Sequence, residues 1–266
     1  MIRSYFGLEQ NPFSAENITL LPHQSDIYDA LVVHCQQGGL SVIIGEPGTG
    51  KSIIKQFIKE KEKTSKKYLI PVVSRTLHTY KNTIKILCNA FSIDFEGSDF
   101  KCEKRLIEEA EVLNRQNKSL ITIIDDAHLM SIDVLRKLRL LFEDFPKNHN
   151  LILVGQPALL NQMRLKINDD IRSRVTYSTI VQKLTFDQMH PFIIDQLNKV
   201  RLPINVFSEE AIEVIIRAAD GFLRKCRNLC ISSLLESVRA KIKEVNIDIV
   251  NRVLIQPHWR TENDLE

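Results

Sequence analysis

The segment GEPGTGKS, at residues 45–52, has the residue types and spacing that capture phosphate groups. It fits the pattern G-x-x-x-x-G-K-[ST], in which glycines let backbone N–H groups approach an anion at the start of a helix. In such a loop Lys51 neutralises the β- and γ-phosphates and the Ser52 hydroxyl holds Mg²⁺. The alternative is a glycine turn that merely precedes a helix. The predicted cofactors are ATP and Mg²⁺, and the predicted nucleotide-binding residues are Gly45, Glu46, Pro47, Gly48, Thr49, Gly50, Lys51 and Ser52.

A second candidate, ITIIDDAHLM at residues 121–130, is an apolar run that stops at two aspartates. Carboxylates at the end of a buried strand are costly unless something binds them. Downstream of a phosphate loop, Asp125 occupies the position of an acid that orients Mg²⁺, and Asp126 that of an acid that polarises the attacking water. The alternative for Asp126 is a non-catalytic helix cap beside the metal site.

These groups require a framework that brings the loop and the acids together. Short apolar runs predict strands, and helical spacing alternates with them. Because strands covered on both faces are apolar at almost every position, the pattern predicts a doubly wound α/β core with a parallel sheet. The predicted strands are residues 40–45, 68–73, 120–125, 151–156 and 177–181, and the helices between them are 51–61, 82–91, 102–114 and 131–142.

After about residue 184 the strand pattern ends. Thr185 and Gln188 have capping-box spacing, which predicts a helix that continues to about Val200. Further helices are expected at residues 208–219, 223–243 and 247–253. The chain is therefore predicted to be an α/β core followed by a small all-helical domain.

Composition adds weaker constraints. The chain has 266 residues and a formal net charge of +3, which permits a nucleic-acid partner without arguing for one. There is no signal-peptide pattern and no apolar run long enough to span a membrane. The five cysteines lack framework spacing, which favours a reducing, cytoplasmic location.

Several motifs in the same order resemble AAA+ ATPases of the ExeA/GspA-like group over essentially the whole chain. The matching segments are YFGLEQNPF (residues 5–13), IIDDAHLM (123–130), LILVGQPALL (151–160), DIRSRV (170–175) and DGFLRKCRNLC (220–230). The resemblance implies an AAA+ P-loop core with a parallel sheet sandwiched by helices, followed by a helical lid. The implied boundaries are 1–184 for the core, including an adenine-side segment at 1–25, then 185–254 for the lid and 255–266 for a C-terminal tail.

The resemblance also assigns roles to single residues. Gln156 corresponds to a polar sensor of the water or γ-phosphate; the alternative is a strand-end residue that bonds a neighbouring loop. Arg174, or less favourably Arg172, corresponds to an arginine finger that reaches a neighbouring subunit's ATP; the alternative for either is a surface arginine on a solvated turn. Arg224 corresponds to a second sensor that couples nucleotide state to the lid, with a structural salt bridge as its alternative.

Pro12 and Phe13 correspond to residues that cover the adenine, although an apolar staple on the lid has the same sequence pattern. Gly221 fits a turn with close approach of the backbone. The main departure from the family is Asp126, where the family has Glu. Its side chain is shorter by about 1.5 Å, and a misplacement of ~1 Å costs about 10²-fold in rate. Slow hydrolysis is therefore one expectation and compensation by a closer strand end is the other.

The family offers two biological roles. One is a DNA-transposition helper, similar to TnsC and IstB regulators, that assembles with ATP on double-stranded DNA as a homo-oligomeric ring or filament and recruits a transposase. The other is a cytoplasmic ATPase for secretion or pilus assembly, and a slow or non-hydrolysing nucleotide switch is a third possibility. The short chain and its ending favour the helper. The candidate DNA-contacting residues are Arg75, Thr76, Lys81, Lys101 and Lys104, with Tyr80 as a stacking aromatic.

Overall fold

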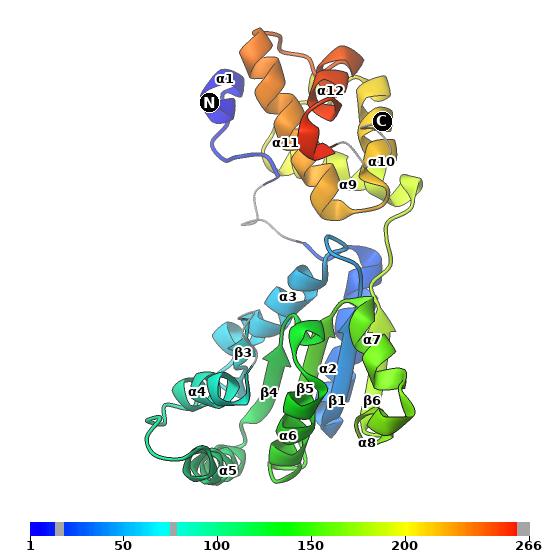
Figure 1. Cartoon of the computed structure of the whole chain (residues 1–266). Coiled ribbons are helices and arrows are strands. Elements are labelled where there is room, and N and C mark those ends of the chain that lie inside the picture. Colours follow the sequence, from blue (N-terminus) through cyan, green and yellow to red (C-terminus); the bar gives the residue numbers. More distant parts are fainter. Residues whose placement is uncertain (14–18, 75–78, 260–266) are drawn as a thin grey trace. The chain divides into compact units, whose positions relative to one another are not determined.

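The computed structural model describes residues 1–13, 19–74 and 79–259, and it divides into two compact units (Figure 1). We call Leu20–Glu46 with Lys51–Val181 the sheet unit. We call Met1–Thr19, Pro47–Gly50 and Gln182–Glu266 the helical unit. The sequence placed residues 1–184 in the core, whereas in the structure the N-terminal segment groups with the helical unit.

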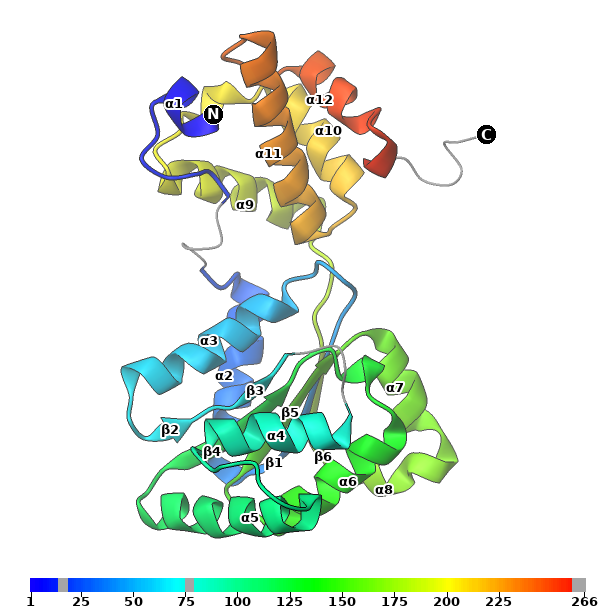
Figure 2. The same cartoon turned by 60° about the vertical axis from the view of Figure 1, so that its left-hand side comes forward.

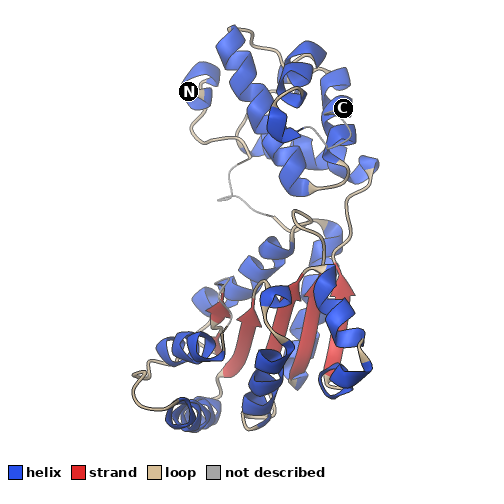
Figure 3. Ribbon diagram, in the orientation of Figure 1, coloured by secondary structure: helices blue, strands red, loops and turns tan. Residues whose placement is uncertain are grey.

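The sheet unit contains one parallel sheet (Figure 3). Its strands run in the order β2-β4-β5-β1-β6, and β3 also pairs with β4. The strands are β1 (Gly39–Ile44), β2 (Tyr68–Leu69), β3 (Val72–Val73), β4 (Ser119–Ile124), β5 (Asn150–Gly155) and β6 (Val175–Ile180). Since all of them are parallel, the segments that follow β1, β4 and β5 meet at one edge, which we call the carboxyl edge; the opposite edge is the amino edge.

Helices cover both faces of this sheet (Figure 2). Alternation along β5 assigns the faces, because Leu151 and Leu153 pack into one apolar cluster while Ile152 and Val154 pack into another. The first cluster is completed by α4 to α8 and the second by α2 and α3. These helices are α2 (Pro22–Gln37), α3 (Lys51–Thr64), α4 (Tyr80–Ala90), α5 (Asp99–Arg115), α6 (Ile132–Glu143), α7 (Pro157–Arg164) and α8 (Asp169–Arg172).

The strand predicted at residues 68–73 is broken in the middle, so its continuity was wrong. Pro71 has no N–H to donate. The backbone of Ile70 is bonded to α3 side chains, since its N–H donates to Glu62 (2.9 Å) and its carbonyl accepts from Lys59 (2.6 Å). Both backbone groups of Ile70 are thus satisfied by a helix, which leaves two short strands on either side.

The helical unit consists of α1 (Ile2–Phe6), α9 (Phe186–Lys199), α10 (Glu209–Ala219), α11 (Leu223–Ala240) and α12 (Ile247–Leu254). The capping box of Thr185 and Gln188 is present at the start of α9, as predicted. Helix α11 ends three residues before the predicted Lys243, because Lys241 adopts a left-handed conformation (φ 56°) and caps the helix. The short helix α1 packs against α11.

Gly221 lies in the turn that joins α10 to α11, with φ of 78°. A Cβ at this position would lie 2.7 Å from both the carbonyl oxygen of Leu184 and the Cβ of Lys183. The Leu184 N–H donates to the Gly221 carbonyl (3.0 Å), so the two segments touch through their backbones. The predicted need for close approach at Gly221 is confirmed.

Candidate functional site

The phosphate-loop sequence lies between β1 and α3, as the pattern requires. At its start, the N–H of Gly45 donates to the carbonyl of Gly155 at the end of β5 (3.2 Å). Gly48 and Gly50 have φ of 90° and 104°, a region that residues with a Cβ rarely adopt. Thr49 is buried, whereas Ser52 in the first turn of α3 is exposed. Within the sheet unit, the N-terminus of α3 and the Ser52 hydroxyl thus lie at the carboxyl edge.

Lys51 folds back over this loop. Its Nζ donates to the carbonyls of Gly45 (2.6 Å) and Glu46 (2.8 Å). The ammonium group is therefore held by backbone carbonyls at the start of the loop. An ammonium here adds positive charge to the N-terminal end of α3, and together they favour an anion.

Asp125 follows β4 at the same edge. Its N–H donates to the Val73 carbonyl (2.9 Å), and its Oδ1 accepts from the N–H of Asp126 (3.1 Å). Its Oδ2 forms an ion pair with Lys55 of α3, and the two side chains are only 16% and 20% exposed. Lys55 lies one helical turn beyond Ser52 on the same helix face. Asp125 is therefore bound to the face of α3 that also carries the Ser52 hydroxyl.

These donors fit a magnesium ion that arrives with phosphate. Mg²⁺ prefers oxygen ligands and in nucleotide sites takes one or two protein side chains, phosphates and water. Asp125 and Ser52 offer a carboxylate and a hydroxyl, which are ligands of this type. Among the described residues no group of three or more His, Cys, Asp or Glu side chains is placed to hold a metal ion.

Asp126 adopts a left-handed conformation (φ 51°, ψ 36°), which aspartate tolerates better than most residues. Its backbone carbonyl starts the turn Ala127–Leu129, but its side chain makes no capping hydrogen bond. Within the described residues its carboxylate has no hydrogen-bond or ion-pair partner. The helix-cap alternative therefore lacks the bond that defines it.

Gln156 follows β5 and is the N-terminal cap residue of α7. The N–H of Leu159 bonds to its carbonyl (3.0 Å), while its half-buried side chain makes no capping bond. The side-chain amide of Gln156, like the carboxylate of Asp126, has no hydrogen-bond partner among the residues that the structure describes. The carboxyl edge thus collects Lys51, Asp125, Asp126 and Gln156 from three different strand ends.

Arg172 and Arg174 lie at the opposite, amino edge. Arg174 directly precedes β6, whose first residue pairs with Leu40 of β1, so it lies at the far end of β1 from the phosphate loop. Both arginines are exposed and ion-paired: Arg172 with Asp169 (2.9 Å) and Arg174 with Glu143 (3.1 Å). Neither is brought together with the phosphate loop of its own chain.

A cavity of about 410 Å³ opens beside Arg174 at this edge. Glu143 joins two arginines there, since it also accepts from Arg139 (2.7 Å). His149 lines the cavity, stacks on Phe142 at 4.6 Å, and bonds through Nε2 to the Thr122 hydroxyl (3.0 Å). Burial lowers the pKa of His149 to about 3, so the imidazole is neutral.

The remaining nucleotide-side predictions fall in the helical unit. The Arg224 N–H, in the first turn of α11, donates to the Gly48 carbonyl (3.2 Å). Arg224 also helps to line a cavity of about 410 Å³ with Lys225 and Trp259. Pro12 and Phe13 are buried, as the staple alternative requires, and adenine contact by them stays a prediction.

The predicted DNA-contacting residues are only partly described. Arg75 and Thr76 lie outside the described residues. Lys81, Lys101 and Lys104 are exposed. They occupy α4 and α5 in the sheet unit.

Carboxylates are interleaved with these lysines. Lys104 lies 3.9 Å from Glu108. The Tyr80 hydroxyl donates to Glu103 (2.8 Å), and Lys137 lies 5.5 Å from the centre of the Tyr80 ring. The ring of Tyr80 is therefore already engaged within the sheet unit. These contacts do not favour the predicted stacking role.

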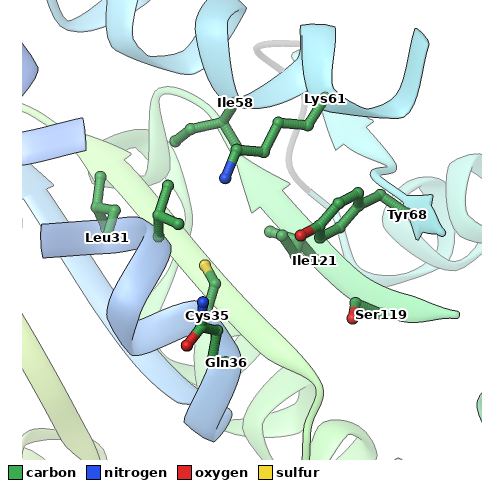
Figure 4. A pocket seen from close by; sticks show the side chains of 9 residues that line it. Leu31, Cys35, Gln36, Ile58, Lys61, Tyr68, Ser119 and Ile121 are labelled. Carbon is green, nitrogen blue, oxygen red and sulfur yellow. The ribbon is translucent and has the colours of Figure 1, made fainter. Parts of the chain in front are cut away.

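A smaller cavity lies between α2, α3 and the first residues of β2 and β4 (Figure 4). Its volume is about 40 Å³, far below the several hundred Å³ of ordinary ligand pockets. Lys61 lies 5.2 Å from the ring centre of Tyr28 and 5.7 Å from that of Tyr68, and burial lowers its pKa. The cavity is a packing feature of the sheet unit and is too small for a nucleotide.

Comparison with known proteins agrees with this geometry. Residues 33–163 match the family model described as AAA domain. General secretion pathway protein A of Aeromonas hydrophila is 23% identical over 260 residues, which cover 94% of this chain and 47% of that protein. The chain thus spans about half the length of this curated relative.

Solved structures give the same fold. The ORC2 protein of Aeropyrum pernix, in ADPNP–ADP complexes, superposes with a TM-score of 0.74 at 15% identity over 94% of this chain and 72% of that chain. The ORC1 protein of the same organism, in complex with DNA, gives 0.70 at 15% identity over 90% and 67%. The Thermotoga maritima RuvB Holliday junction branch migration motor gives 0.58 at 18% identity over 87% and 66%.

The predicted fold class is confirmed: a parallel sheet flanked by helices with the AAA+ P-loop fold, followed by a helical region. The chain is thus similar in sequence to the AAA domain family and to General secretion pathway protein A, and it shares its fold with the ORC and RuvB proteins. None of the helices in the described ranges combines the length and apolar character needed to cross a membrane.

Proposed function

We propose that this protein binds ATP with Mg²⁺ and hydrolyses it to ADP and phosphate. The observation that carries the proposal is the convergence at the carboxyl edge of a phosphate loop, a Lys51 ammonium held over it, and an acid, Asp125, bound to the helix face that carries Ser52. Bound Mg²⁺ would neutralise phosphate charge.

The chain's own residues supply the rest of the chemistry. The loop N–H groups and Lys51 bind the phosphates, and Ser52 and Asp125 hold the metal side of the nucleotide. Asp126 orients and polarises the attacking water, and the Gln156 amide helps to position that water or the γ-phosphate. The unpartnered state of these last two side chains supports the roles, because each has its hydrogen-bonding capacity free for a ligand. Arg224 is the proposed second sensor.

The proposed arginine finger, Arg174, acts on a second copy of the chain. It lies about five residues along the sheet from the end of β1, roughly 16 Å at the rise of a parallel strand, which is more than an arginine side chain spans. Arg174 therefore cannot reach the phosphate loop of its own chain. The proposed assembly is therefore an ATP-dependent homo-oligomer, a ring or a filament.

Nucleotide binding and phosphate release by the wild type and Lys51→Ala test the proposal. We expect the wild type to bind a fluorescent ATP analogue in Mg²⁺ and to release phosphate, and Lys51→Ala to lose both. Binding without phosphate release above the Lys51→Ala background would instead identify a nucleotide switch. Absence of binding by the wild type would refute the proposal.

We propose further that the ATP-bound oligomer assembles on double-stranded DNA and recruits or regulates a transposase. The support is the motif series of the chain and the likeness of its fold to a protein solved in complex with DNA. Phosphate contacts would dominate, so DNA affinity should fall steeply with added salt. A filter-binding assay at low salt that shows no ATP-dependent retention of DNA would refute this role.

The second candidate role, an ATPase for secretion or pilus assembly, is favoured by the similarity to General secretion pathway protein A. The two roles predict different genetic neighbours. An adjacent transposase gene supports the helper, and adjacent secretion or pilus genes support the second role.

A further inference from the structure

Asp125 is neutralised by a residue that the motif does not contain. Lys55 lies on α3, 70 positions before Asp125 in the chain, and its ammonium pairs with Asp125 Oδ2. Both side chains are largely buried, at 20% and 16% exposure. A carboxylate with so little access to water needs a compensating charge, and here a lysine supplies it.

The position of Lys55 is set by firm packing. Ile54 and Ile58 on either side of it are almost fully buried against the sheet, so α3 cannot rotate to move Lys55 away. Lys55 is also three residues after Ser52, which places both on the same face of the helix. Its ammonium thus contacts one of the two oxygen donors proposed for Mg²⁺, Asp125, and lies on the helix face that carries the other, Ser52.

We propose that Lys55 is a built-in counter-ion that competes with Mg²⁺ for Asp125. This inference rests on the proposed nucleotide function. In the nucleotide-free protein the ammonium of Lys55 balances the charge of Asp125. When the metal–nucleotide complex binds, Lys55 releases Asp125. Because breaking the ion pair costs free energy, it weakens the binding of the metal. Lys55 therefore sets how strongly nucleotide binding depends on Mg²⁺, as a positioning residue for Asp125.

The test measures the dissociation constant of a non-hydrolysable fluorescent ATP analogue twice, in EDTA and in saturating Mg²⁺. The measured ratio is the dissociation constant in EDTA divided by that in Mg²⁺. We expect Lys55→Met to raise this ratio by about tenfold, as for an ion pair somewhat stronger than a fully exposed one. Lys55→Arg keeps the counter-ion and should stay near the wild-type ratio. Lys63→Met, an exposed lysine at the end of the same helix, removes the same charge and should not change it.

Thermal unfolding without nucleotide, in EDTA, provides a second readout. Lys55→Met should melt below the wild type because Asp125 loses its counter-ion, and Lys63→Met should not. If Lys55→Met lowers the melting temperature but leaves the ratio unchanged, Lys55 is merely structural and the inference is overturned. A ratio that falls also overturns it. If the wild type does not bind the analogue at all, the proposed function fails and this inference with it.

Discussion

The two edges of the parallel sheet differ in how their polar side chains are satisfied. At the carboxyl edge, within the described residues, Asp126 and Gln156 make no side-chain hydrogen bonds, although each follows a buried strand. At the amino edge, Arg174 and Glu143 are paired with each other, and the buried His149 is bonded to a neighbouring strand. Both side chains are half-buried, so their hydrogen-bonding groups are accessible to a ligand. The proposed nucleotide would bind at the carboxyl edge, whereas the exposed arginines of the amino edge form ion pairs within the chain.

The largest expected effect tests whether the amino edge acts on another subunit. Arg174→Ala should bind ATP normally but lose about 10³-fold in hydrolysis rate, because a finger arginine stabilises charge only in the transition state. Arg172→Ala should change the rate little. An equimolar mixture of Arg174→Ala and Lys51→Ala should regain activity, since one variant supplies the finger and the other the phosphate loop.

The measurement is steady-state phosphate release at a protein concentration that permits assembly. A mixture that remains as inactive as its two components would contradict action in trans. Loss of activity in Arg172→Ala with normal activity in Arg174→Ala would transfer the role to the other arginine.

A smaller effect tests the unpartnered acid of the carboxyl edge. Asp126→Asn should retain nucleotide binding and lose about 10²-fold in turnover, because the amide no longer polarises the water. Asp126→Glu restores the longer side chain and should raise turnover several-fold if reach limits the reaction. Single-turnover phosphate release measures both, and wild-type rates in Asp126→Asn would remove this residue from the mechanism.

The smallest effect concerns stability at the amino edge. The pKa of His149 is about 3 in the folded state and near 6.5 when unfolded, so the unfolded chain binds the extra proton between these values. The contribution of neutral His149 to the free energy of unfolding is complete above pH 6.5. Below that pH it is lost at about 1.4 kcal/mol per pH unit. Urea unfolding at pH 7.5 and 5.5 should show this loss in the wild type.

The matched control for that experiment is the double variant Thr122→Val with His149→Leu, which removes the imidazole without leaving the hydroxyl unpaired. Between the two pH values, the free energy of unfolding of this variant should fall by about 1.4 kcal/mol less than that of the wild type. An equal loss in both proteins would assign the acid sensitivity to other groups.

Local sequence was sufficient to predict several features. The phosphate loop is one contiguous segment whose glycines restrict it to few conformations, and the capping box of Thr185 and Gln188 spans one helical turn. Each depends on residues that are close along the chain. The alternation of apolar runs and amphipathic segments likewise predicted the parallel sheet, although α1, α2, α7 and α8 were not predicted.

Pairings between residues that are far apart along the chain could not be predicted from the sequence. The counter-ion of Asp125, Lys55, lies on another element, and the partner of Arg174, Glu143, is 31 positions away. Tyr80 was predicted to stack on a nucleic-acid base, but its hydroxyl is bound to Glu103 of the next helix. Such side chains have several chemically suitable partners in the sequence, and only the packing of the elements selects among them.

The sequence by itself determined where the phosphate loop and the strand-ending acids lie, because both depend on backbone conformation and on residues that are close along the chain. The tertiary structure alone decided the state of each charged group: which acid has a counter-ion, which remains unpartnered, and which arginine lies out of reach of its own loop. The physical reason is that Coulomb interactions and desolvation depend on distance and burial in space, and neither quantity is fixed until the strands and helices have packed.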